Sequence, residues 1–194
     1  MTYPDKTVYP VASCNDKDFQ NLMDVYLDGV FHPSIYREPK IFKQEGWHYE
    51  LPSEDAPLTV NGVVYNEMKG AFSSPESVLE RFTSSVLFPD TPYSNESGGD
   101  PAVIPNLSYE QFIQFHKDYY HPANSYIYLY GDMDMEEKLL WLDKEYLSAY
   151  DKKDFTLDSS IALQKPFTEP VEKETTYSVT ANEGCLLYTS PSPR

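Results

Sequence analysis

Hydrophobic residues recur with helical spacing near the start of the chain. Between Asn15 and about Phe31, apolar side chains fall at i, i+3, i+4, i+7, i+8 and i+11, which is the pattern of an amphipathic helix. Asn15 is a favourable N-cap residue, and His32-Pro33 ends the stretch. The apolar stripe consists of Phe19, Leu22, Met23, Tyr26, Leu27 and Val30.

Further helices are predicted where capping residues precede apolar positions on one face. The clearest signal is the capping box of Ser108 with Gln111. Ser74-Pro75 is a strong pair of cap and first-turn residues. The predicted helical ranges are 38–44, which is a single turn, then 65–70, 75–86, 109–120 and 135–150.

Strands are predicted where apolar and polar residues alternate or β-branched and aromatic residues gather. Residues 47–51 and 58–64 read as a hairpin with an irregularity at Gly62, and 7–12 as a short edge segment. Ser125–Tyr130 is the strongest predicted strand. Because helices and strands alternate loosely, with hairpins included, the predicted class is α+β with a mixed or antiparallel sheet.

The charge of the chain is strongly acidic, since 31 Asp and Glu against 15 Lys and Arg give a formal net charge of −16. Nucleic acids and anionic membranes bind basic faces, so neither is an expected partner. A negative field attracts basic ligands, although surplus carboxylates also serve solubility alone. The chain has no apolar run of about 18 residues and does not start as a signal or transit peptide. We therefore expect a cytoplasmic location.

The segment Gly62–Gly70 (GVVYNEMKG) carries the most informative residue, Glu67. Spacing alone makes Glu67 an ordinary solvated helix residue. The segment resembles, however, the region of pitrilysin- and insulysin-type metallopeptidases that supplies the third zinc ligand, and the presequence-protease branch in particular. Three further segments resemble that branch in the same order, so the likeness covers about residues 1–184. They are TYPDKTVYPVAS, FPDTPYSNESGGDPAVIP and YEQFIQFHKDYYHPANSYIYLYGD.

The resemblance implies a fold, a cofactor and a role for one residue. The implied fold is a ferredoxin-like mixed sheet with helices packed on it, the pitrilysin-like metallohydrolase domain. The implied cofactor is one Zn²⁺, held in such peptidases by three protein ligands with a fourth position for water. Two ligands come from an H-x-x-E-H motif whose Glu is the general base. By the resemblance, Glu67 is the third ligand.

The sequence departs from the family pattern at the decisive motif. It contains no H-x-x-E-H, and no two of its four histidines (His32, His48, His116 and His121) are separated by three residues. We therefore expect a truncated fragment whose motif would precede Met1, with no catalytic residue of its own. The expected organisation is 1–155 as the later part of the catalytic domain, 156–174 as a linker, 175–184 as the first strand of a non-catalytic domain and 185–194 as a non-native tail.

Other polar clusters have simpler readings than ligand binding. His116 and His121 are five residues apart at a helix end, which favours packing or helix-end capping over a metal pair. Asp132, Asp134 and Glu136 lack the spacing of a calcium loop and are expected at a helix N-terminus. Cys14 is expected to be a core thiol. The ending Cys185–Arg194 resembles a translated sequencing adapter; a genuine disordered tail is the alternative.

The resulting functional prediction is a fragment of a zinc metalloendopeptidase that degrades unstructured peptides. Basic peptides suit the acidic charge of the chain best. The fragment carries the third zinc ligand, Glu67, but lacks H-x-x-E-H, so it is expected to be inactive alone. The alternative is a non-catalytic homologue of the same fold with a peptide-binding or structural role.

Overall fold

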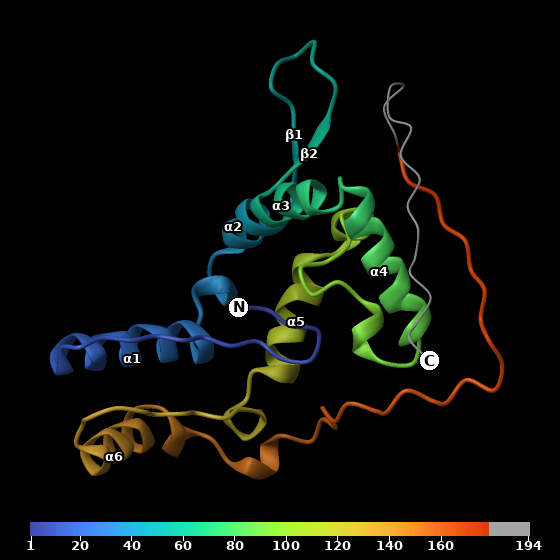
Figure 1. Ribbon diagram of the computed structural model, residues 1–194. Coiled ribbons are helices and arrows are strands. Elements are labelled where there is room, and N and C mark those ends of the chain that lie inside the picture. Colours follow the sequence, from blue (N-terminus) through green and yellow to red (C-terminus); the bar gives the residue numbers. More distant parts are fainter. Residues whose placement is uncertain (179–194) are drawn as a thin grey trace.

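The computed structural model describes residues 1–178, in which helices dominate (Figure 1). Short 3₁₀ turns and one π turn, Phe42–Gly46, join the longer elements. One antiparallel sheet of two strands is present in this part of the chain. The elements are α1 (Asp16–Phe31), α2 (Pro39–Ile41), β1 (His48–Glu50), β2 (Thr59–Asn61), α3 (Val63–Ala71), α4 (Pro75–Leu87), α5 (Tyr109–Tyr119) and α6 (Met135–Glu145).

The capping signals of the sequence predict the helix starts correctly. The side chain of Asn15 accepts a hydrogen bond from Asp18 N at the start of α1. Ser74 does the same for Ser77 N at the start of α4. The capping box of Ser108 is complete before α5. Local side-chain bonds to otherwise unpaired N–H groups therefore fix these starts.

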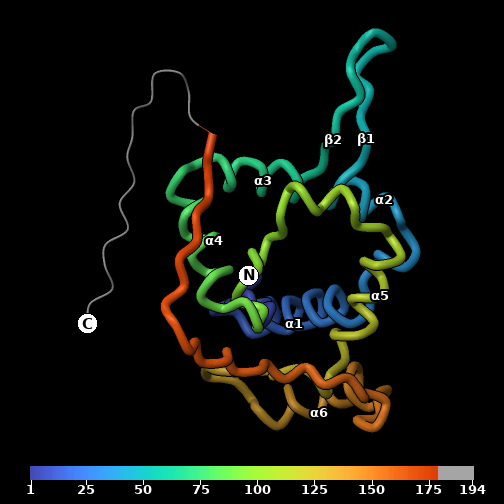
Figure 2. The backbone as a smooth tube through the Cα atoms, turned by 90° about the vertical axis from the view of Figure 1, so that its right-hand side faces the viewer, coloured from blue at the N-terminus to red at the C-terminus, as the bar shows by residue number. Residues whose placement is uncertain are grey.

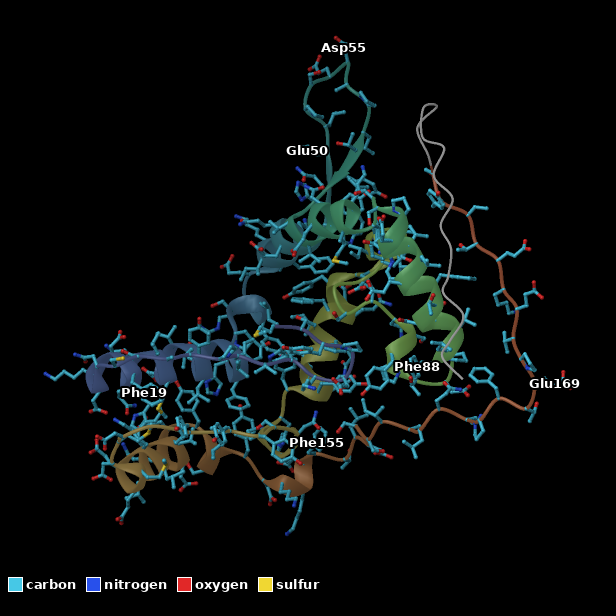
Figure 3. All side chains as sticks on the ribbon, in the orientation of Figure 1. Phe19, Glu50, Asp55, Phe88, Phe155 and Glu169 are labelled. Carbon is cyan, nitrogen blue, oxygen red and sulfur yellow. The ribbon has the colours of Figure 1, made fainter. Side chains whose placement is uncertain are left out.

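The predicted hairpin is confirmed, with shorter strands than expected. β1 pairs with β2 in the register His48↔Asn61, Tyr49↔Val60 and Glu50↔Thr59. The hairpin projects from the rest of the molecule, and Asp55 lies near its far end (Figures 1 and 3). Beyond Asn61 the chain turns at Gly62 into α3, so the expected strand to residue 64 gives way to a helix.

Helices α1 and α6 lie side by side and share the best-packed core of the described residues (Figures 1 and 2). Phe31, Leu142 and Tyr146 are buried together. Lys138 is buried as well, and its Nζ lies 3.1 Å from Oδ1 of Asp16. α6 ends at Glu145, earlier than predicted, and a 3₁₀ turn continues over Leu147–Ala149.

Helix α5 and the residue before its N-cap are tied to the chain between α1 and the hairpin by hydrogen bonds. The hydroxyl of Tyr109 on α5 donates to Ile35 O at 2.6 Å, and Trp47 Nε1 donates to Leu107 O at 2.9 Å. Buried apolar residues in this part are scattered between elements, for example Ile104 and Ile113. These long-range hydrogen bonds connect the 3₁₀ turn Ser34–Tyr36 to α5, and the residue before β1 to the residue before the N-cap of α5.

The strongest strand prediction is wrong. Residues 125–130 have no regular secondary structure, and Tyr126, Tyr128 and Tyr130 are 104%, 83% and 83% exposed. The rings of Tyr128 and Tyr130 stack 6.5 Å apart, as side chains two residues apart do on an extended chain. A strand requires hydrogen-bond partners on a neighbouring strand, and no described residue pairs with this stretch.

The first predicted β segment is wrong for a related reason. Residues 8–12 form no strand, and only an isolated bridge joins Thr2 to Thr7. Pro4 and Pro10 carry no backbone N–H with which to extend a ladder. The segment therefore remains a loop, in which Val8 N donates a hydrogen bond to Met1 O.

The described residues confirm a structure that mixes helices with one small antiparallel sheet, while the larger ferredoxin-like sheet stays a prediction. The chain exposes 15258 Å² of surface, whereas a compact monomer of this mass exposes about 9,400 Å². Within residues 1–178, many large apolar side chains are exposed, for example Tyr126 and Leu163. Among residues 1–178, no helix has the length and apolar character needed to cross a bilayer.

Residues 156–178 contain no helix or strand and run along the outside of the molecule (Figures 1 and 3). Gln164 joins this stretch to the turn after α4, because it accepts from Asp90 N at 3.0 Å and donates to Asp90 Oδ2 at 2.8 Å. The predicted tail 185–194 and most of the predicted strand 175–184 lie outside the described residues.

Candidate functional site

Helix α3 is positioned by a sharp turn that only glycine can form. Gly62 has a φ of 157°, and a Cβ there would lie 2.2 Å from Gly46 O. Asn61 secures the turn, since its Oδ1 accepts from Gly62 N at 2.8 Å and from Asn66 Nδ2 at 2.6 Å. Its Nδ2 donates to Glu50 Oε2 at 2.8 Å. The helix is thereby joined rigidly to the base of the hairpin.

Glu67 lies in the middle of α3, so the expectation of a helical position is confirmed. The next residue, Met68, is buried, whereas Glu67 is exposed. A Cβ on Gly98 would lie 2.3 Å from Met68 Sδ, so the loop that contains Gly98 packs against the inner face of α3. Within residues 1–178, Glu67 makes no hydrogen bond or ion pair. Its carboxylate is available to a ligand, and its role stays a prediction.

A pocket of about 360 Å³ adjoins the C-terminal half of α3. Met68, Ala71 and Phe72 line one side of it, and Arg81 of α4 lines another. The guanidinium carbon of Arg81 lies 3.2 Å from the centre of the Phe72 ring. Glu67 and Ala71 are one helical turn apart, so the pocket begins close to the predicted ligand. No sequence pattern marks Arg81, because only the fold brings it beside Phe72.

The two neighbouring histidines act in packing and capping, as expected. His116 stacks on Tyr120 with ring centres 4.4 Å apart. Nδ1 of His121 accepts a hydrogen bond from Ala123 N at 3.0 Å and caps a 3₁₀ turn.

Both ring nitrogens of His116 have partners, since Nδ1 lies 2.6 Å from the Tyr36 hydroxyl and Nε2 lies 2.9 Å from Val30 O. Nδ1 of His121 is used by the cap, whereas its Nε2 is buried without a partner among the described residues. Within residues 1–178, the two rings share no contact that would pair them on a metal, so the structure favours packing and capping.

The acidic group before α6 is also structural. Oδ1 of Asp134 accepts from Glu137 N at 3.0 Å and caps the helix. Glu136 lies in the first turn, where negative charge suits the helix dipole. The expectation for Cys14 is wrong, because this residue is exposed. It directly precedes Asn15, the N-cap of α1.

Glu67 has no companion ligands among the described residues. Within residues 1–178, no group of three His, Cys, Asp or Glu side chains is arranged to hold a metal ion. A carboxylate oxygen is a suitable zinc ligand, but one carboxylate does not make a catalytic zinc site. The described residues could therefore supply one of the three protein ligands of such a site, but not all three.

Known proteins resemble this chain over most of its length. "Protein HypA" of Clostridium perfringens is 55% identical over 183 residues, which are 94% of this chain and 19% of that protein. "Presequence protease 1, chloroplastic/mitochondrial" of Arabidopsis thaliana is 51% identical over 88% of this chain and 16% of its own length. "Presequence protease, mitochondrial" of Drosophila melanogaster is 44% identical over the same shares.

The chain belongs to the presequence-protease branch of the M16 peptidases. In addition, residues 106–188 match the family model described as "Peptidase M16 inactive domain". This range includes α5 and α6 but not Glu67 on α3. The chain spans less than a fifth of the length of these M16 relatives, so what the complete proteins do is carried to this chain only as a proposal.

Proposed function

We propose that this chain is a part of a zinc metalloendopeptidase that degrades unstructured peptides, and that Glu67 is one of its three zinc ligands. The observation that carries the proposal is the open carboxylate of Glu67. It is exposed in the middle of α3, on a helix held rigidly at Gly62, and it has no partner among residues 1–178. The identity to presequence proteases supports the same assignment.

In this proposal, zinc supplies the acidity that activates water and polarises the scissile carbonyl. The part of this chain is to hold one ligand oxygen in place. α3 does so because Asn61 and Gly62 fix its start, while Met68 anchors its inner face. The two other ligands and the general base would come from an H-x-x-E-H motif, which these 194 residues lack. The chain alone is therefore proposed to be inactive.

The remaining sequence predictions complete the proposal. Residues 1–155 would belong to the catalytic, ferredoxin-like domain, 156–174 would link it to the next, and 175–184 would begin that domain. Basic unstructured peptides would be favoured by the net charge of −16. The cytoplasm is the proposed compartment, and fractionation of the source cells would test it against an organelle of the kind named for the Arabidopsis relative.

The test uses a longer polypeptide in which an H-x-x-E-H segment precedes Met1. This protein should bind one zinc and cleave an unstructured basic peptide. Glu67→Gln should abolish most of both activities, because the amide is a poorer ligand than the carboxylate. Glu76→Gln, at an exposed residue of the neighbouring helix α4 that does not line the pocket, is the matched control and should leave both intact. Full zinc content and cleavage in Glu67→Gln would contradict the proposal.

The second candidate function is a non-catalytic M16 homologue of the same fold that binds peptides or has a structural role. The match of residues 106–188 to the family's inactive domain favours it for that part of the chain. The same longer polypeptide separates the two. Peptide binding without zinc uptake or cleavage would support the non-catalytic role.

A further inference from the structure

His116 joins three elements that are far apart in the sequence. Its Nε2 lies 2.9 Å from the carbonyl oxygen of Val30 on α1. Its Nδ1 lies 2.6 Å from the hydroxyl of Tyr36 in the 3₁₀ turn Ser34–Tyr36, and the two rings meet edge to face. The ring also stacks on Tyr120, whose hydroxyl is 2.8 Å from that of Tyr9.

The partners of His116 determine where its proton lies. A carbonyl oxygen only accepts, so Nε2 must carry the hydrogen that is donated to Val30. In a neutral ring Nδ1 is then bare and accepts the hydrogen of the Tyr36 hydroxyl. The observed contacts are therefore those of one neutral tautomer.

Partial burial between three elements opposes a positive charge on the His116 ring. α1 presents the carbonyl of Val30, the 3₁₀ turn presents Tyr36, and α5 itself presents Tyr120. Lys117 follows His116 on α5, and its Nζ lies 6.0 Å from the centre of the Tyr36 ring. No carboxylate in the described part of the chain pairs with the ring. Burial lowers the pKa of His116 from its ordinary value of 6.5, although the bond to Val30 acts in the opposite direction.

We propose that the Tyr36–His116–Val30 contact is an acid-sensitive joint between α5 and the α1 corner. A proton from solvent at Nδ1 removes the acceptor of the Tyr36 hydroxyl and places a half-buried cation among aromatic rings. The Tyr36 hydroxyl must then turn its hydrogen away from Nδ1. Separation of α5 from the α1 corner exposes the protonated His116 ring to water, which solvates its charge. Because α1 carries α6 through their shared core, acid loosens this helix pair from α5 before the chain unfolds as a whole.

The sign of the effect follows from the tautomer. The neutral ring stabilises the joint fully above pH 6.5, the ordinary value. This contribution is lost as the pH falls below that value, through the lower pKa of the closed form. Each unit between the two pKa values makes opening up to tenfold more favourable at acid pH.

The test follows His116 by nuclear magnetic resonance in the full chain, together with amide hydrogen exchange at residues 28–36 between pH 7.5 and 5.0. We expect a titration midpoint below 6.5, a protonated Nε2 at neutral pH and faster corrected exchange in acid. Tyr36→Phe should move the midpoint toward 6.5, whereas Tyr126→Phe, at a fully exposed tyrosine, should not. His116→Asn should lose the acid response. A midpoint at or above 6.5, a protonated Nδ1 at neutral pH, or an unchanged acid response in His116→Asn would overturn the proposal.

Discussion

The α1–α6 pair and the segment 125–130 are both rich in aromatic and aliphatic residues, but only the helix pair buries them. In the pair, Phe31, Leu142 and Tyr146 are at most 8% exposed. In the segment, Tyr126 is fully exposed and Tyr128 nearly so. Helices close their backbone hydrogen bonds within themselves, so two of them suffice to form a core. A strand needs another strand before its side chains can pack.

In one respect α3 resembles the segment 125–130 more than the helix pair, because it exposes a side chain that has no partner among residues 1–178. Its fold is complete, yet the carboxylate of Glu67 has no partner among residues 1–178. The buried residues of the α1–α6 pair stabilise the fold of this chain. Glu67 and the tyrosines of 125–130 are exposed and can contact another molecule or another part of a longer protein. The following predictions test this difference between buried and exposed residues.

The largest expected effect is a cavity in the core of the helix pair. Leu142 is 4% exposed, so Leu142→Ala should lower the free energy of unfolding by about 3 kcal/mol. Leu163→Ala, at a residue 92% exposed, should change it by less than about 0.5 kcal/mol. Urea denaturation of the two variants measures both values. Equal losses would show that the core is not where the structure places it.

The second prediction concerns the ion pair between α1 and α6. The Lys138 side chain is 3% exposed but that of Asp16 is 73% exposed. Asp16→Asn leaves a buried ammonium without its carboxylate and should cost about 2 kcal/mol. Lys138→Met removes the buried charge and fills its space, so unfolding free energy should stay within about 1 kcal/mol of the original. If Lys138→Met lowers the free energy of unfolding more than Asp16→Asn does, the ion pair itself stabilises the helix pair.

The third prediction removes one hydroxyl from the same core. Tyr146 donates to Asp24 O at 2.9 Å or to Asp24 Oδ1 at 2.6 Å, so Tyr146→Phe should cost about 1 kcal/mol. Burial, helped by Asp24, raises the pKa of Tyr146 above its ordinary value of 10. The folded state therefore favours the neutral phenol, and this stability is lost as the pH rises above 10.

Alkaline unfolding checks this sign. Tyr146→Phe should show a weaker loss of stability between pH 9.5 and 11 than the original chain. Tyr126→Phe, in the segment 125–130, should leave the alkaline profile unchanged. An identical profile for all three proteins would show that Tyr146 does not titrate as its contacts imply.

The sequence predicts those features that short stretches determine by themselves. Asn15, Ser74 and Ser108 start helices with side chains that act within three residues. Residues 125–130 have the composition of a strand, but strand formation depends on a distant partner that composition cannot specify. Likewise, the segment Gly62–Gly70 predicts that Glu67 lies on a helix, and its resemblance to the peptidases predicts a ligand role for the carboxylate. It cannot show which residues meet that carboxylate.

The smallest expected effect is at Glu67 itself. Glu67→Gln in this chain should leave the free energy of unfolding unchanged within about 0.5 kcal/mol, because the carboxylate has no partner among residues 1–178. Asp134→Ala is the matched comparison and should cost about 1 kcal/mol, since Asp134 caps α6. Calorimetric titration should detect no stoichiometric zinc in either protein, because one ligand does not hold the ion. Stoichiometric zinc that disappears in Glu67→Gln would show that this chain already brings further ligands to α3. The carboxylate of Glu67 would then have partners within the chain, as the buried residues of the α1–α6 pair do.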